Sequence, residues 1–167
     1  ENQTEVITGD DGHFEIHNIP TGSDYTLVPE KDGNILNGVT TMDIILITKH
    51  ILGVQPFESP YKYIASDVNG SQSITTSDLI KLRKLVLHID EELPQGVNSW
   101  RFIDAGFVFP QAENPWATEI PGLLNLNNLA TDEMQADFVG IKIGDVNNSA
   151  TPNSLIGVED RMAYAEF

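Results

Sequence analysis

Two stretches of the chain place apolar residues at the three- and four-residue spacing of an amphipathic helix. They cover residues 38–53 and residues 73–89. In the first stretch, Thr40 or Thr41 is suited to cap the helix and Gly53 to end it. The residues expected on its buried face are Ile44, Ile47, Ile51 and Leu52. The pattern predicts two helices that each bury one apolar face.

The two helical stretches are copies of one sequence unit. At an offset of 35 residues, which is the distance from Asp43 to Asp78, both identity and apolar pattern recur. The identical pairs include Thr40 and Thr75, Thr41 and Thr76, Asp43 and Asp78, and Ile45 and Ile80. Since each helix is too apolar on one face to stand alone, this internal duplication predicts that the helices pack on each other.

Alternating polar and apolar residues predict strands on both sides of the helices. The strands expected before them cover residues 4–8, 13–17 and 25–28. The strands expected after them cover residues 99–104, 107–110, 123–129 and 137–143. Residues 54–66, with Pro56 and Pro60, are expected to link the two repeats. The expected fold class is α+β, with a pair of loop–helix repeats, N-terminal strands and an additional irregular β-rich region.

The residues before the second helix carry oxygen atoms at alternating positions. Counted from Asp67, positions 1, 3, 5 and 12 are Asp, Asn, Ser and Asp, which is the spacing of an EF-hand-type calcium loop. The ligands expected here are Asp67, Asn69, Ser71, Ser73 and Asp78. Gln72 stands at position 6 in place of the usual glycine, which predicts backbone strain. Only two carboxylates are present, which predicts weak binding typical of extracellular modules.

The corresponding loop before the first helix is incomplete. Counting back from Asp43, positions 1, 3 and 5 are Asp32, Asn34 and Leu36, and a leucine side chain has no ligating oxygen. The second half of this loop, residues 37–43, is intact.

A near-copy of the missing first half stands near the C-terminus, at residues 145–149. This copy lacks a second half, because Pro152 intervenes and its twelfth position is Ile156. We therefore hypothesise that the chain returns to build one site from two distant segments. The ligands would be the Gly38 carbonyl, Asp43, Asp145, Asn147 and Ser149. The competing interpretations keep Asp32 and Asn34 as ligands or leave the site empty. Two Ca²⁺ ions are expected in all.

The duplicated half EF-hand resembles a dockerin domain over residues 32–90. The residues that match the family motif are Asp67, Asn69, Ser71, Ile74, Thr76, Ser77 and Asp78. The resemblance implies a docking surface for a cohesin-like partner, centred on the helix starts and a basic pair. The residues implied are Thr41, Met42, Thr76, Ser77, Arg83 and Lys84. Whether the aromatic region at 93–144 covers that surface stays open.

A second resemblance lies at the N-terminus. Residues 11–16, 19–22 and 25–27 are similar to the last strands of prealbumin-like or Cna-B-like surface sandwiches. On the predicted strand 13–17, His13, Glu15 and His17 would share one face. Zinc sites usually need more ligands than this strand offers, so a solvated face is favoured over a metal site.

The composition narrows the classes of function. The net charge is −16, from 25 acidic and nine basic residues, which disfavours nucleic acids and anionic lipids as partners. No cysteine is present, so disulfides, thiolate zinc sites and cysteine nucleophiles are excluded. No apolar run approaches the roughly 20 residues of a membrane span. No catalytic triad order, zinc motif or phosphate loop stands out, so an enzyme is not expected.

These observations predict a non-catalytic, extracellular structural module that binds calcium and connects domains of a larger secreted or cell-surface protein. The expected divisions are 1–30 as the end of a β-domain, 31–150 as the calcium-binding module with its insertion at 93–144, and 151–167 as a linker and the start of a following domain from Val158. The expected partners are flanking domains of the same polypeptide or copies of the chain in a surface assembly. The alternative is a dockerin-type module that binds a cohesin-like partner.

Overall fold

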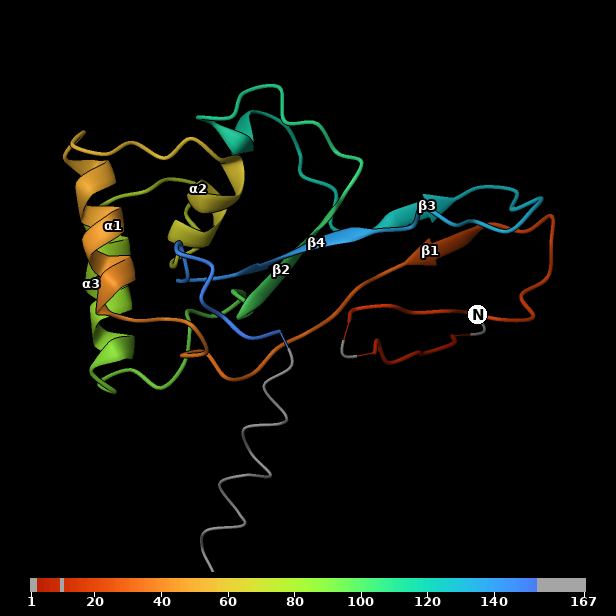
Figure 1. Ribbon diagram of the computed structural model, residues 1–167, viewed down its shortest axis with the longest axis horizontal. Coiled ribbons are helices and arrows are strands. Elements are labelled where there is room, and N and C mark those ends of the chain that lie inside the picture. The colour runs from red at the N-terminus through yellow and green to blue at the C-terminus, as the bar shows by residue number, and fades with distance from the viewer. Residues whose placement is uncertain (1–2, 10, 153–167) are drawn as a thin grey trace, which may run out of the picture.

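The computed structural model describes residues 3–9 and 11–152 (Figure 1). It has an α+β fold with three α-helices and two antiparallel two-stranded sheets in these residues, which confirms the expected α+β class. The helices are α1 (Thr41–Ile51), α2 (Pro60–Ser66) and α3 (Thr76–Val86), with a short 3₁₀ helix, η1 (Pro115–Ala117). The strands are β1 (Tyr25–Leu27), β2 (Trp100–Asp104), β3 (Leu124–Leu126) and β4 (Phe138–Lys142).

Helices α1 and α3 begin with the same local structure, as their duplication predicts. Thr40 caps α1, and its side chain accepts a hydrogen bond from the Met42 backbone N–H at 3.2 Å. Thr75 caps α3 in the same way. In each helix the aspartate of the first turn bonds back to the capping residue, which completes a capping box. The alternative cap, Thr41, is the first residue of α1.

Both helices end with the same backbone turn although only one ends on a glycine. Gly53 follows α1 with φ +68°, and the Val54 N–H reaches back to the Lys49 carbonyl at 2.9 Å. His88 takes the equivalent place after α3 with φ +54°, and Ile89 N–H bonds Lys84 O at 2.9 Å. These are Schellman-type ends, in which a left-handed residue redirects the chain.

The hydrophobic core lies where α1, α2, α3 and the β2–β4 sheet meet. Its fully buried members include Ile47, Ile64, Leu82 and Ile103. Ile44 and Ile51 pack against it and are partly buried, in line with the expected apolar face. The assignment of Leu52 to that face is wrong, since its side chain is 69% exposed. Leu52 is the C-cap residue of α1, where the chain already leaves the helix direction.

Helix α2 replaces part of the predicted link at residues 54–66. Pro60 is its first residue, where a proline fits because the missing N–H has no partner in the first turn of any helix. Tyr63, Ile64, Ala65 and Ser66 are all buried, so α2 is a central element of the core. The proline was interpreted as a helix breaker, although it starts this helix.

The two sheets differ in position. Strand β2 pairs with β4 in a register that joins Trp100 to Lys142 and Asp104 to Phe138. Strand β1 pairs with β3, with Tyr25 opposite Leu126. Figure 1 shows the β1–β3 ribbon extending away from the helices, while β4 runs toward them. Strands β2, β3 and β4 confirm the strands expected within 99–104, 123–129 and 137–143.

Three predicted strands are not formed. Residues 4–8, 13–17 and 107–110 have no regular secondary structure. Within the described part of the chain the only strand pairs are β1–β3 and β2–β4, so these segments have no ladder to join. Alternation favours a strand only where a neighbour takes up the backbone hydrogen bonds. The expected strand 25–28 is shortened to β1. The predicted domain start after Val158 lies outside the described residues, as do all residues from 153 onward.

None of the helices in the described ranges is long and apolar enough to cross a membrane.

Candidate metal centre

The first candidate site is residues 67–78, called here the contiguous loop. Asp67 follows the last residue of α2, and its two carboxylate oxygens accept separate backbone hydrogen bonds. Oδ1 accepts from Ser71 N–H at 2.8 Å and Oδ2 accepts from Gln72 N–H at 2.8 Å. The loop therefore wraps around the Asp67 carboxylate.

The far end of the contiguous loop closes on the same point. Asp78 Oδ1 accepts a hydrogen bond from the Asn69 N–H at 3.2 Å, while Oδ2 accepts from the Thr75 N–H at 2.9 Å. The Ser71 hydroxyl donates to the Ser73 carbonyl at 3.3 Å. The structure thus gathers the oxygen atoms of positions 1, 3, 5, 7 and 12 into one loop.

The second candidate site is built from residues 38–43 and 145–149, called here the split loop. Asp43, in the first turn of α1, accepts hydrogen bonds at Oδ1 from Val146 N–H at 2.9 Å and Asn147 N–H at 3.3 Å. Its Oδ2 accepts from Thr40 N–H at 2.8 Å. The chain after β4 therefore returns to the start of α1.

The returning segment wraps around its own aspartate as the contiguous loop does. Asp145 Oδ1 accepts from Ser149 N–H at 3.2 Å, and Oδ2 accepts from Ala150 N–H at 2.7 Å. The Ser149 hydroxyl donates to the Gly38 carbonyl at 2.9 Å, which ties the returning segment to the second half of the loop.

Four hydrogen bonds of the contiguous loop have an equivalent in the split loop. The matching positions are Asp145 and Asp67, Asn147 and Asn69, Ser149 and Ser71, Ala150 and Gln72, Gly38 and Ser73, and Asp43 and Asp78. Two segments separated by about a hundred residues thus reproduce the geometry that the contiguous loop achieves within twelve.

Asp32 and Asn34, the competing ligands, lie in a different network. Asp32 Oδ1 accepts a hydrogen bond from Ser99 N–H at 2.9 Å, and the Ser99 hydroxyl donates to the Gly33 carbonyl at 2.9 Å. The hydrogen bonds from Ser99 hold the pKa of Asp32 below its ordinary value. Within residues 3–9 and 11–152, neither Asp32 nor Asn34 is hydrogen-bonded to Asp43. This geometry favours the split loop over the competing ligand set.

The four aspartates of the two loops are buried. The exposed fractions are 0% for Asp43 and Asp78, 6% for Asp67 and 4% for Asp145. In the described part of the chain, none of them forms an ion pair with a basic side chain. Burial raises the pKa of Asp67 above its ordinary value, and the Asp78 carboxylate adds to the increase. Burial and like charge disfavour two ionised carboxylates in one loop, and a cation between them would compensate this cost.

The donor set restricts the kind of metal. Among the described residues, no group of three or more His, Cys, Asp or Glu side chains that could hold a metal is present. Each loop instead offers two carboxylates together with amide, hydroxyl and backbone carbonyl oxygens. Hard cations such as Ca²⁺ accept six to eight ligands of this kind, whereas zinc prefers nitrogen and sulfur. The residues present therefore fit Ca²⁺.

Backbone conformation also distinguishes the loops. Gln72 has φ +61°, which is the strain predicted from its place at position 6. Gly38 has φ +74°, and a Cβ atom there would overlap the backbone of Ala150. A glycine before α1 is thus required for the returning segment to approach.

Further anchors of the returning segment were missed by sequence reasoning. The Asn37 amide makes two hydrogen bonds with the Thr151 backbone, donating at 2.7 Å and accepting at 3.0 Å. The buried Lys142 at the end of β4 donates to the Ile35 carbonyl at 2.9 Å, and burial lowers its pKa to about 8. No local pattern identifies these contacts, because each partner is more than a hundred residues away.

The residues implied for partner binding are exposed. They are Thr41, Met42, Thr76, Ser77, Arg83 and Lys84. Apolar residues at matching positions of the two helices are exposed beside them, with Ile45 at 49% and Ile80 at 58%. In the described residues, the Phe109 ring contacts the rings of Phe107 and of Tyr61 on α2, and neither phenylalanine forms a ring contact with α1 or α3.

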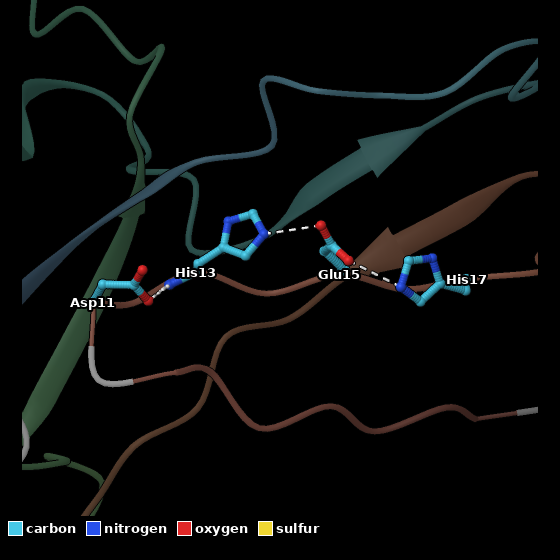
Figure 2. A network of polar contacts seen from close by, with 4 residues as sticks. All are labelled: Asp11, His13, Glu15 and His17. Atoms are coloured by element: carbon cyan, nitrogen blue, oxygen red, sulfur yellow. Dashed lines mark hydrogen bonds and ion pairs between the residues drawn. The ribbon is translucent and has the colours of Figure 1, made fainter.

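The N-terminal histidines form a separate exposed network (Figure 2). Glu15 lies between His13 and His17, with its oxygens 3.1 Å and 3.0 Å from their Nε2 atoms. The hydrogen bond that the Glu15 carboxylate accepts from His13 raises the pKa of His13 and lowers the pKa of Glu15. All three side chains are more than half exposed, so this cluster is a solvated network of polar contacts.

Comparisons of the chain with protein-family models, curated proteins and solved structures found no match.

Proposed function

We propose that the protein is a non-catalytic structural module that binds two Ca²⁺ ions, one in the contiguous loop and one in the split loop. The observation that carries this proposal is the pair of matching oxygen cages, each with two buried aspartates that form no direct ion pair with a basic side chain among the described residues. Two desolvated carboxylates in one cage repel each other unless a cation lies between them. The dockerin-like repeat is consistent with this proposal.

The split loop defines what the ion would do for the fold. One cation at Asp43 and Asp145 would join the start of α1 to the chain that leaves β4. The module would then be rigid between its two ends, which suits a connector of domains in a secreted or cell-surface protein. With two carboxylates per site, the dissociation constants are expected on the order of 10⁻⁴–10⁻³ M, the range of extracellular modules.

The test is a calcium titration by calorimetry combined with thermal unfolding. We expect two ions per chain, and a rise in Tm that corresponds to about 2.7 kcal/mol when free calcium is 100 times the dissociation constant. Asp145→Ala should reduce the stoichiometry to one. The matched control is Asp132→Ala, which removes an exposed aspartate outside both loops. A Tm that is the same in calcium and in chelator would contradict the proposal.

A docking function is the second candidate, because the exposed apolar residues on α1 and α3 are also duplicated. Besides Ile45 and Ile80, Leu52 is 69% exposed and its counterpart Leu87 is 60% exposed. If this face binds a cohesin-like domain, the double change Ile45→Asp and Ile80→Asp should weaken binding at least tenfold in a pull-down with calcium. Met134→Asp, at an 84% exposed site elsewhere, is the control. Absence of binding by the unaltered protein would reject this candidate.

A further inference from the structure

The backbone of Gly144 connects the first halves of the two loops. Its N–H donates to the Ala65 carbonyl at 2.8 Å. Gly144 immediately precedes Asp145, and Ala65 lies two residues before Asp67. A single backbone hydrogen bond therefore connects the residue before Asp145 to the chain just before Asp67.

The same glycine also leaves little space toward helix α3 and the second half of the split loop. A Cβ atom at Gly144 would lie 3.0 Å from Leu82 Cδ1 and 3.1 Å from Val39 Cγ2. Leu82 is on α3, one turn after Asp78, and Val39 directly follows Gly38. Residues within or directly beside both loops thus surround Gly144, whose φ of +91° is a backbone conformation that favours glycine.

The surroundings of this junction are rigid. Val68 and Val146, which follow the first aspartate of each loop, are both 0% exposed. The neighbouring Ile143 N–H bonds the Ser99 carbonyl at 2.9 Å, which holds the junction to the start of β2. A displacement of either loop would therefore disturb close-packed atoms shared with the other.

We infer that the two ion sites are coupled through Gly144 and bind calcium with positive cooperativity. This inference rests on the proposed function. An ion in the contiguous loop orders Asp67 and, through Ala65 and Gly144, the backbone that presents Asp145. The second ion then meets a site that is already ordered, so less ordering entropy opposes its binding.

The first test compares calcium titrations of the unaltered protein with those of Asp67→Asn and Asp145→Asn, which remove equivalent ligands. We expect a Hill coefficient above 1 for the unaltered protein. Each variant should bind one ion, with affinity at least about fivefold weaker than the affinity for the second ion in the unaltered protein. Because coupling is reciprocal, the two weakening factors should agree. Two ions that bind independently would overturn the coupling and leave the proposed function intact, whereas no binding at all would overturn the proposed function.

The second test keeps every ligand and alters only the junction. Gly144→Ala places a methyl group against Leu82 and Val39, and we expect it to bind two ions with the cooperativity lost. Gly96→Ala is the matched control, since Gly96 has a similar φ of +85° and no atoms within 4 Å of its Cβ position. Unchanged cooperativity in folded Gly144→Ala, judged by circular dichroism, would overturn the inference. If that variant does not fold, the Asp→Asn pair decides.

Discussion

Gln72 and Gly38 both have a left-handed backbone conformation, but the space around them differs. Both have positive φ, but Gln72 carries a side chain at +61° whereas Gly38 at +74° carries none. The difference follows from space: the Gln72 side chain is exposed, while a Cβ at Gly38 would overlap Ala150. At Gly38 the split loop needs a glycine for close approach, because the backbone of a second segment of the chain passes there. The contiguous loop tolerates strain at its surface instead.

This strain predicts a stabilising substitution. Gln72→Gly should raise the free energy of unfolding by up to about 1 kcal/mol. A left-handed non-glycine residue costs about 1–2 kcal/mol, and glycine removes this cost. The greater conformational freedom of glycine in the unfolded chain offsets part of the gain. Urea unfolding in saturating calcium is the measurement.

The control for this substitution is Gln95→Gly, at an exposed loop position whose φ is not positive. There the same change should lower or leave unaltered the free energy of unfolding. A fall in stability for Gln72→Gly as large as that of the control would contradict the strain argument.

The helices show how far sequence patterns determine structure in this protein. The duplication correctly predicted α1, α3 and their packing, because their capping residues and apolar faces are encoded within one short unit. It also indicated the contiguous loop, whose ligand positions follow one another at fixed spacing. Helix α2 was missed since Pro60 resembles a breaker and only the core reveals it as a first-turn residue.

The strands and the split loop show what local patterns leave undetermined. Residues 13–17 alternate as a strand should, yet no partner strand lies beside them in the described chain. Conversely, the pairing of Asp43 with Asp145 was inferred only by matching two incomplete motifs. No sequence motif identifies the hydrogen bonds of Asn37 to Thr151 and of Lys142 to Ile35, because any asparagine or lysine could make them. Long-range contacts of single polar groups depend on the complete fold.

The molecule as a whole divides into a part that contains both candidate calcium loops and a part that contains neither. Both loops are anchored among α1, α2, α3 and the end of β4, whereas the β1–β3 ribbon extends away from them (Figure 1). Calcium removal should therefore loosen one part and spare the other. The segment most dependent on the ion is residues 145–151, because its backbone N–H groups donate to the carboxylates of Asp43 and Asp145.

Hydrogen–deuterium exchange in calcium and in chelator measures this difference within one chain. Without the ion, repulsion between Asp43 and Asp145 opposes closure of the split loop, so amides of residues 145–151 should exchange at least about tenfold faster, equivalent to about 1.4 kcal/mol of opening free energy. Amides paired in the β1–β3 ribbon are the internal control and should keep their exchange rates. Equal acceleration of exchange in both regions would indicate general unfolding. Unchanged exchange rates at residues 145–151 would show that contacts such as Asn37 to Thr151 hold the returning segment without calcium.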